Sequence, residues 1–301
     1  MATTEGDAAA PQRRAAWILL APFLVLFLGT FVAPIGYAIY QSFIRVERAG
    51  LFGEEGTTSS FAGLRNYAEA FANNEFVGSI GRMFLFGVVQ VPVMIAAATV
   101  LALLLESASA RWPAAFRAAY FMPYGVPGVI ASVLWSFLYV PGLSPIIDVA
   151  ALVGIDIDFL GPSTVLWSIA NIVTWTYTGY NMLIIVAQLK AIPAEIYEAA
   201  RVDGAGPLRV AGSVQLPLIR PALLLTIVFS IIGTLQIFAE PQILQQVSTA
   251  VGNEYTPNMA AFDAAFNYND YNLAAAEAVI IALTAFALSF VFLRLTNRGQ
   301  R

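Results

Sequence analysis

The sequence contains no cysteine, no histidine and only one lysine, Lys190. The chain therefore has no thiolate nucleophile and no disulfide, and it lacks imidazole, the commonest metal ligand and the side chain that titrates near neutral pH. The glycine-rich spacing of a phosphate-binding loop does not precede Lys190. We expect no hydrolytic triad, no metal site, no cofactor and no nucleotide site of that kind, so the chain is not expected to be an enzyme.

Charged residues are also scarce. They make up 11% of the 301 residues, whereas hydrophobic residues make up 59%, and a soluble domain carries about 25% charged residues. Long uncharged runs recur along the chain, and roughly 20 apolar residues cross a bilayer as a helix. We predict an all-α polytopic membrane protein with a membrane domain at 15–295, tails at 1–14 (disordered) and 296–301, and six transmembrane helices at about 17–43, 81–105, 115–140, 164–189, 221–244 and 273–294.

The basic residues are unevenly distributed among the loops between these spans. Pairs or clusters precede span one, separate spans two and three, separate spans four and five and follow span six, whereas the loops after spans three and five have no lysine or arginine. Cytoplasmic loops of membrane proteins are enriched in these residues. The pattern predicts that both termini and the loop between spans four and five face the cytoplasm.

One helical stripe of span four is polar. Thr174, Tyr177, Thr178 and Asn181 recur at the i, i+3, i+4 and i+7 positions, which share a helix face. Such a stripe either joins helices through hydrogen bonds or lines an aqueous path. The interleaved aromatic residues favour the path, because aromatic faces beside directed polar groups suit a carbohydrate. Candidate path residues are Thr174, Trp175, Tyr177, Tyr180, Thr234, Gln236 and Glu240.

Two carboxylates lie within predicted spans. Glu240 is near the outer end of span five and Glu277 is about one turn inside the outer end of span six. An acid within a span is costly and is by default a functional candidate, although water near the membrane surface reduces the cost. Each residue could contact a solute or a protein that delivers it, or could be a structural residue at the membrane surface.

Two irregular segments precede span four. Met122-Pro-Tyr-Gly-Val-Pro127 must interrupt helical hydrogen bonding in span three, and it predicts either a flexible element or a packing kink. In the first outer loop, a surface helix is expected to begin near Leu64.

The loop at 193–217 has the most specific spacing in the chain. Glu-Ala-Ala is followed by three residues, a glycine, nine residues and Val-x-Leu-Pro, with Glu198, Ala199, Ala200, Gly204, Val214, Leu216 and Pro217 at the defined positions. Pro193 suits a first helical turn, and Gly204 can end a helix in the left-handed conformation. We predict a helical hairpin, with a first helix at 195–203 and a second that starts at Pro207 and ends at Leu216-Pro217. Glu198 and Asp203 would offer anionic contacts.

This spacing resembles the signature loop of ABC importer permeases of the binding-protein-dependent type I family. Leu189-Lys-Ala-Ile-Pro193 and Tyr197-Glu-Ala-Ala-Arg-Val-Asp-Gly204 further resemble the carbohydrate permeases of the maltose type, and Phe61-Ala-Gly-Leu-Arg-Asn-Tyr67 resembles a segment that follows the first helix in sugar permeases. Trp17-Ile-Leu-Leu-Ala-Pro-Phe, with Pro34, Tyr37 and Ser42-Phe43, is similar to the start of the first permease of each pair. One departure lies after span five, where those proteins often have Thr-x-Gly-Gly-Pro and this chain has Gln245-Gln-Val-Ser-Thr.

The resemblance implies a permease of the bacterial cytoplasmic (inner) membrane that imports a sugar, in particular an oligosaccharide, by alternating access. It implies a second homologous permease, two ABC ATPase subunits that bind ATP and Mg²⁺, an extracytoplasmic binding protein and surrounding lipid, with no nucleic acid. The ATPase would contact Glu198, Ala199, Ala200, Asp203, Gly204, Leu216 and Pro217. Other possible functions are import of a glycerol phosphodiester or a polyamine, or ion-coupled secondary transport, although the latter should need titratable groups near the membrane midplane.

Overall fold

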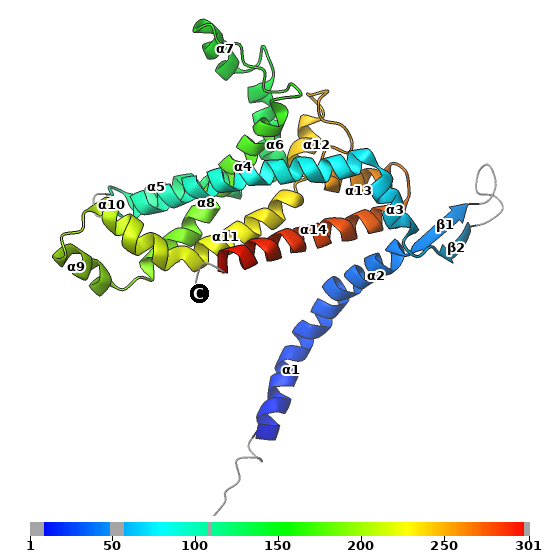
Figure 1. The fold of residues 1–301 in the computed structure, drawn as a ribbon, viewed down its shortest axis with the longest axis horizontal. Coiled ribbons are helices and arrows are strands. Elements are labelled where there is room, and N and C mark those ends of the chain that lie inside the picture. The colour runs from blue at the N-terminus through cyan, green and yellow to red at the C-terminus, as the bar shows by residue number, and fades with distance from the viewer. Residues whose placement is uncertain (1–8, 49–56, 108–109, 298–301) are drawn as a thin grey trace, which may run out of the picture.

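The structure is a computed structural model that describes residues 9–48, 57–107 and 110–297. Figure 1 shows an elongated helical bundle in which α4 (Asn74–Leu105), α8 (Val165–Lys190), α11 (Leu216–Leu235) and α14 (Tyr271–Asn297) run along the long axis. α4 packs on α8 and α11, and α11 also packs on α14. The chain is an all-α membrane protein apart from one small hairpin, formed by β1 (Ile44–Arg48) and β2 (Thr57–Phe61).

Four helical stretches in the described part of the chain are long and apolar enough to cross a membrane, at Ala16–Ser42, Asn74–Leu105, Pro207–Leu244 and Tyr271–Thr296. A fifth is the bent pair Pro113–Gly125 and Gly128–Tyr139. The sequence predicted six. The difference is α8, whose 26 residues are numerous enough to span but which is not among the stretches that are apolar enough. Its polar residues include Ser168, Asn171, Thr174 and Asn181.

α8 is the centre of the bundle. In one half of its length, Ile169 and Ile172 are buried against Met83 and Phe86 of α4. In the other half, Met182 and Ile185 pack in a second cluster whose members include Ala98 and Ala102 of α4. Small residues allow helices to approach closely in a membrane, where packing rather than the hydrophobic effect drives association. The helix with the most polar face is therefore the one that the other helices enclose.

The predicted break in span three is a sharp bend. α5 (Pro113–Phe121) runs into a 3₁₀ turn, η2 (Met122–Gly125), and α6 (Gly128–Tyr139) leaves at 95°. Pro123 and Pro127 cannot donate helical hydrogen bonds. The N–H of Val126 instead donates to the carbonyl of Pro123 at 3.1 Å. α6 leads away from the bundle to α7 (Pro145–Leu152), a short helix in the loop after the predicted span three (Figure 1).

The first helix lies largely apart from the bundle (Figure 1). α1 (Ala9–Phe27), the π-helical stretch η1 (Leu28–Val32) and α2 (Ala33–Ser42) follow without a break, and α2 packs on α14. The irregular stretch η1 lies just before Pro34, whose missing N–H frees a carbonyl one turn earlier. The described helix includes residues 9–14, which were expected to belong to a disordered tail. Residues 1–8 lie outside the described part.

After the hairpin, the chain forms α3 (Arg65–Ala72), the surface helix expected near Leu64. Side chains of α3 bond to the C-terminal end of α2. The buried amide of Asn66 donates to the carbonyls of Ser42 and Ile44 at 2.9 and 2.8 Å. The hydroxyl groups of Tyr67 and Ser42 lie 2.6 Å apart. Gly63 has a φ of +56°, which favours glycine in the preceding turn. The Gly-Leu-Arg-Asn-Tyr segment thus caps the end of the first membrane helix.

Replacing Asn66 by alanine should lower the thermal unfolding midpoint of the purified protein in detergent. The substitution leaves two carbonyls without their donor, and an unsatisfied buried group costs about 1–3 kcal/mol. Asn74→Ala, at an exposed position of α4, is the matched control and should leave the midpoint unchanged. Equal midpoints for the two variants would show that Asn66 does not hold α2 and α3 together.

The loop at 193–217 is only partly the predicted hairpin. α9 (Ala194–Val202) matches the first predicted helix, and Gly204 has a φ of +73°. The second helix does not end at Leu216-Pro217. α10 (Pro207–Val210), the π-helical stretch η3 (Ala211–Gln215) and α11 form one continuous helix, because the N–H of Leu216 bonds to the carbonyl of Ala211 in the π pattern and Pro217 lies in the first turn of α11.

The end of the bundle where α11 ends has further short helices. α11 ends at Leu235, and α12 (Ala239–Leu244) follows after a three-residue break, so the predicted span 221–244 is interrupted. α13 (Pro257–Phe266), which the sequence did not predict, begins at the capping residue Thr256 and packs on α14. α14 extends to Asn297, and residues 298–301 of the predicted tail lie outside the described part.

Candidate functional site

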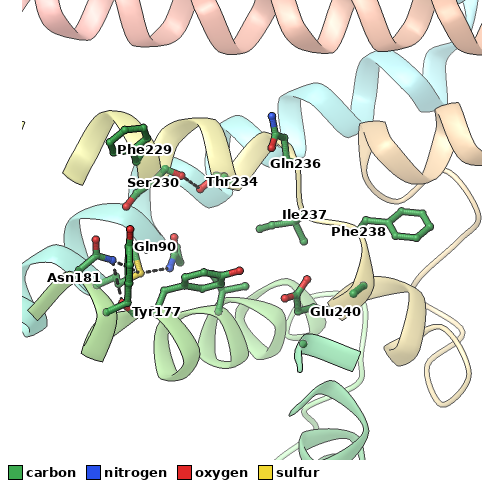
Figure 2. Close-up of a pocket in the computed structure, with 16 residues that line it drawn as sticks. Gln90, Tyr177, Asn181, Phe229, Ser230, Thr234, Gln236, Ile237, Phe238 and Glu240 are labelled. Carbon is green, nitrogen blue, oxygen red and sulfur yellow. Dashed lines mark hydrogen bonds between the residues drawn. The ribbon is translucent and has the colours of Figure 1, made fainter. Parts of the chain in front are cut away.

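A cavity of about 480 Å³ opens between α8, α11 and the start of α12 (Figure 2). Its walls combine aromatic rings, amides, hydroxyls and one carboxylate. The side chains and glycines that line it are Gln90, Met94, Gly128, Val173, Tyr177, Tyr180, Asn181, Phe229, Ser230, Gly233, Thr234, Gln236, Ile237, Phe238, Ala239 and Glu240. This volume is within the range of small-molecule sites in proteins.

The break between α11 and α12 forms one end of the cavity. Gln236 follows the last residue of α11, and its N–H donates to the carbonyl of Gly233 at 3.0 Å. The chain then turns so that Glu240 lies in the first turn of α12, only 8% exposed. A carboxylate is stabilised near a helix N-terminus by the backbone dipoles. Broken membrane helices of this kind are tolerated where they line a cavity.

Amide side chains lie at the other end, away from Glu240 (Figure 2). Gln90 of α4 donates to the hydroxyl of Thr174 at 3.3 Å and to the sulfur of Met94 at 3.4 Å. Asn181 of α8 donates to the carbonyl of Tyr177 at 3.0 Å and makes a weak 3.7 Å contact with the same sulfur. These hydrogen bonds fix the orientation of both amides, and they connect α4 to α8 across the cavity wall.

The aromatic wall is held by the bend in span three. Tyr124 of η2 stacks on Tyr180 with ring centroids 4.6 Å apart, and it meets Tyr177 edge-on at 5.8 Å. Tyr177 and Tyr180 remain 39% and 37% exposed. The bend therefore supports the two tyrosines from behind and leaves part of each ring accessible.

The structure brings most of the predicted path residues together. Tyr177, Tyr180, Thr234, Gln236 and Glu240 all line the cavity. Thr174 lies beside it through the hydrogen bond from Gln90. Trp175 does not line it and packs edge-on against Trp135, with centroids 5.8 Å apart.

The sequence did not single out the contributions of α4 and the middle of α11. Gln90 and Met94 lie in an otherwise apolar run, and Phe229 and Ser230 lie in another. Gln90 and Ser230 could have been identified, because each is a polar residue within an apolar run. Met94 and Phe229 could not. Thr178, a member of the polar stripe, donates to the carbonyl of Thr174 in its own helix at 2.6 Å.

A second cavity, of about 390 Å³, lies beside the loop at 193–217. Glu106 at the end of α4, Lys190 at the end of α8, and Tyr197, Glu198 and Arg201 of α9 line it. Glu198, Ala199, Asp203, Gly204 and Pro217 are exposed, and Ala200 and Leu216 are half-buried. Val202 and Leu208 are 87% and 90% exposed. The loop thus presents apolar and acidic side chains away from the bundle, at the end opposite to the hairpin (Figure 1).

The other intramembrane acid lies outside the main cavity. Glu277 of α14 is 1% exposed, and its Oε2 has no hydrogen-bond partner among the described residues. Arg82 of α4 donates to the carbonyl of Tyr255 at 2.6 Å and covers its ring at 4.4 Å. Burial raises the pKa of the Tyr255 hydroxyl, and the Arg82 charge partly opposes that rise. Within the described ranges, no group of three or more acidic side chains is placed to hold a metal ion.

Comparison with known proteins identifies the family. Residues 78–301 match the family described as binding-protein-dependent transport system inner membrane component. The chain is 29% identical to the lactose transport system permease protein LacF of Rhizobium radiobacter, over 91% of each chain. It is 28% identical to the sn-glycerol-3-phosphate transport system permease protein UgpA of Agrobacterium fabrum, over 93% of this chain and 96% of that one.

Solved structures share the fold. A bacterial ABC transporter involved in import of the acidic polysaccharide alginate has a chain that superposes with a TM-score of 0.81 over 98% of this chain and 100% of that one, at 18% identity. A second structure of an alginate transporter, in complex with a periplasmic protein bound to an alginate pentasaccharide, gives a TM-score of 0.80.

The family match confirms the resemblance based on the loop at 193–217 and on the flanking segments. Members of this family are multi-pass proteins of the inner membrane and serve as permease subunits without a cofactor or catalytic activity of their own. The chain belongs to the binding-protein-dependent ABC transporter permeases, the inner membrane components of importers.

Proposed function

We propose that the chain is the sugar-translocating permease of an ABC importer and that its cargo is an oligosaccharide. The observation that carries this proposal is the main cavity, in which Tyr177 and Tyr180 offer partly exposed rings beside amides and hydroxyls. Aromatic faces suit the apolar faces of sugar rings, and directed polar groups suit their hydroxyls. The relative named for lactose transport supports the same class of cargo.

In this proposal the chain crosses the membrane six times, with α8 as a full span. Its 26 residues rise about 39 Å at 1.5 Å per residue, which exceeds the hydrocarbon thickness of roughly 30 Å. Its polar face is satisfied inside the protein, as intramembrane polar groups require. Both termini and the loop at 193–217 then face the cytoplasm, in agreement with the distribution of arginine and lysine.

The loop at 193–217 is proposed to bind one of two ATPase subunits through Glu198, Ala199, Ala200, Asp203, Gly204, Leu216 and Pro217. Its two halves connect directly to the walls of the cavity. α9 follows α8 after a short turn, and α10 continues through η3 into α11 without a break. Because α8 and α11 carry Tyr177 and Thr234, a displacement of the loop by the ATPase moves both walls.

This geometry supports alternating access. ATP binding by the paired ATPases draws the loops of this chain and of a second homologous permease together, which opens the cavity toward an extracytoplasmic binding protein. Hydrolysis reverses the movement and releases the sugar inward. The π-helical stretch η3 is the irregular point between the loop and the wall, and such stretches often mark functional positions in helices.

Tyr177→Ala and Gln236→Ala test the cargo path. In cells that express the complete importer, each variant should reduce uptake of radiolabelled uncharged di- and trisaccharides. Loss of an aromatic contact or of a hydrogen bond costs about 0.5–1.5 kcal/mol, which corresponds to a roughly two- to tenfold weaker interaction. Co-purification of the ATPase should be unaffected.

Tyr40→Ala is the matched control, because Tyr40 is an exposed tyrosine of α2 outside the cavity. Its uptake should equal that of the unsubstituted chain. If the cavity variants lose assembly with the ATPase instead of uptake, the polar stripe of α8 serves helix packing and the proposed path is wrong.

A further inference from the structure

We propose that Glu240 determines the charge selectivity of the cavity, so that it accepts uncharged polyhydroxylated solutes and rejects anionic ones. The inference rests on the proposed function and narrows the class of cargo. Among the described residues that line the cavity, Glu240 is the one acidic side chain, and none is lysine or arginine. A relative is named for transport of sn-glycerol 3-phosphate, which is an anion. Rejection of anionic solutes is therefore not a property of the family as a whole.

The position of Glu240 keeps its carboxylate inside the cavity. The residue is 8% exposed and lies in the first turn of α12, which packs on α6 and α8. Gly128, the first residue of α6, also lines the cavity, and a Cβ built on it would lie 3.7 Å from Oε1 of Glu240. The carboxylate is thus adjacent to the N-terminal end of a twelve-residue helix as well as to the first turn of its own helix. Both sets of backbone dipoles stabilise its negative charge.

A buried negative charge without a neighbouring cation favours binding of uncharged solutes over anionic ones. A carboxylate accepts hydrogen bonds from neighbouring hydroxyls of a sugar, and hydrogen bonds to a charged group are stronger than those between neutral groups. A phosphate or carboxylate of a solute would meet repulsion in a region of low dielectric, and no arginine or lysine of the cavity wall could neutralise it. Tyr177 provides a ring face near the same carboxylate (Figure 2), and Tyr180 also lines the cavity.

Equilibrium binding by the complete importer in lipid nanodiscs tests the inference. The ligands are radiolabelled lactose and raffinose as uncharged sugars, glycerol 3-phosphate as an anion and spermidine as a cation. The unsubstituted complex should bind an uncharged sugar and no glycerol 3-phosphate. Glu240→Gln, which keeps the shape and removes the charge, should weaken sugar binding about tenfold, equivalent to about 1.4 kcal/mol. The same variant should gain measurable binding of glycerol 3-phosphate.

Gln236→Lys is a second test of charge selectivity, and it leaves the buried carboxylate of Glu240 unchanged. Gln236 is an exposed residue of the cavity wall, so the new ammonium group can be accommodated and should allow glycerol 3-phosphate to bind. Asp148→Asn removes an exposed carboxylate of α7, outside the cavity, and should change neither preference.

The outcomes separate the inference from the proposed function. If the unsubstituted complex binds sugar and Glu240→Gln binds it equally well without accepting the anion, Glu240 does not set selectivity although the sugar importer stands. Binding of glycerol 3-phosphate by the unsubstituted complex overturns the inference directly. If spermidine binds and no sugar does, or if none of the solutes binds, both the inference and the sugar cargo are wrong.

Discussion

Gly179→Ala should abolish the folded state of this permease. A Cβ at this position of α8 would collide with the carbonyl oxygen of Tyr120 and would lie 3.0 Å from the Cα of Phe121. These atoms belong to the backbone at the end of α5, so no side-chain rotation can relieve the collision. The cost should reach or exceed the upper end of the roughly 1–3 kcal/mol that overpacking causes. The yield of monodisperse protein in detergent should fall to near zero.

The same contact also supports the cavity. α5 leads directly into η2, where Tyr124 stacks on Tyr180 at 4.6 Å. If α5 moves away from α8 to admit a methyl group, Tyr124 loses its place behind the cavity wall. Any Gly179→Ala protein that survives purification should therefore have a lower sugar affinity as well as a lower unfolding temperature.

Two other glycines form a graded control series. A Cβ on Gly81 would have no atom within 4 Å, and one on Gly87 would lie 3.2 Å from a methyl group of Thr234. Gly81→Ala should be neutral or stabilising by about 0.5–1 kcal/mol, since alanine is the better helix residue. Gly87→Ala should have an intermediate effect. Normal yield of Gly179→Ala beside these controls would mean that α5 and α8 do not approach as closely as described.

Local sequence signals predicted local structure well. Pro193, Gly204 and the intervening helix formers place α9, because capping and left-handed glycine depend only on neighbouring backbone groups. The predicted end of the second helix at Leu216-Pro217 was wrong, because the prediction considered only the local effect of the proline. A proline removes one hydrogen bond, but the preceding π-helical stretch absorbs the defect and lets the helix continue into α11.

The cavity could be predicted in part, from the polar face of α8 and from the polar residues Thr234, Gln236 and Glu240 of the predicted span five. Val173, Tyr177, Tyr180 and Asn181 share one face of α8 at the i, i+4, i+7 and i+8 positions, and all of them line the cavity. Trp175 is two residues before Tyr177, about 200° around the helix, and therefore packs elsewhere.

Tertiary packing decided the remaining features. The run that contains Gln90 is apolar on all sides, so nothing in its pattern indicates which residues turn toward α8. The proximity of Gln90 to Thr174 depends on the packing of α4 against α8, 84 positions apart in sequence. The approach of Gly128 to Glu240 likewise depends on the bend that turns α6 toward α12. No local rule supplies such contacts between distant segments.

Glu198→Lys should leave the permease folded and inserted in the membrane but should uncouple it from ATP hydrolysis. Glu198 is exposed on α9 and lines the second cavity, so its replacement should not affect stability. In the proposed complex its carboxylate meets a cationic groove of the ATPase. Breaking one partner of an interfacial charge pair costs about 2–5 kcal/mol, which corresponds to a roughly 30-fold or larger loss of affinity.

The measurements are ATP-driven sugar uptake, ATPase co-purification and the yield of permease in membranes. Yield should be normal, whereas uptake and co-purification should both fall. Glu198→Gln should have a smaller effect, because the shape remains and only the charge is lost. Asp156→Lys, which makes the same change in charge at an exposed position between α7 and α8, should behave like the unsubstituted chain.

Comparison of Glu198→Gln, Glu198→Lys and Asp156→Lys distinguishes an effect of charge on coupling from an effect on folding. A loss of uptake that follows the series from glutamine to lysine at position 198, with constant yield, requires a partner of positive charge at that point of α9. Normal uptake and normal co-purification in Glu198→Lys would instead remove the basis for placing the ATPase on this loop. The exposed Val202 and Leu208 would then need another partner, because exposed apolar side chains that lie together on one loop indicate a surface that binds another protein.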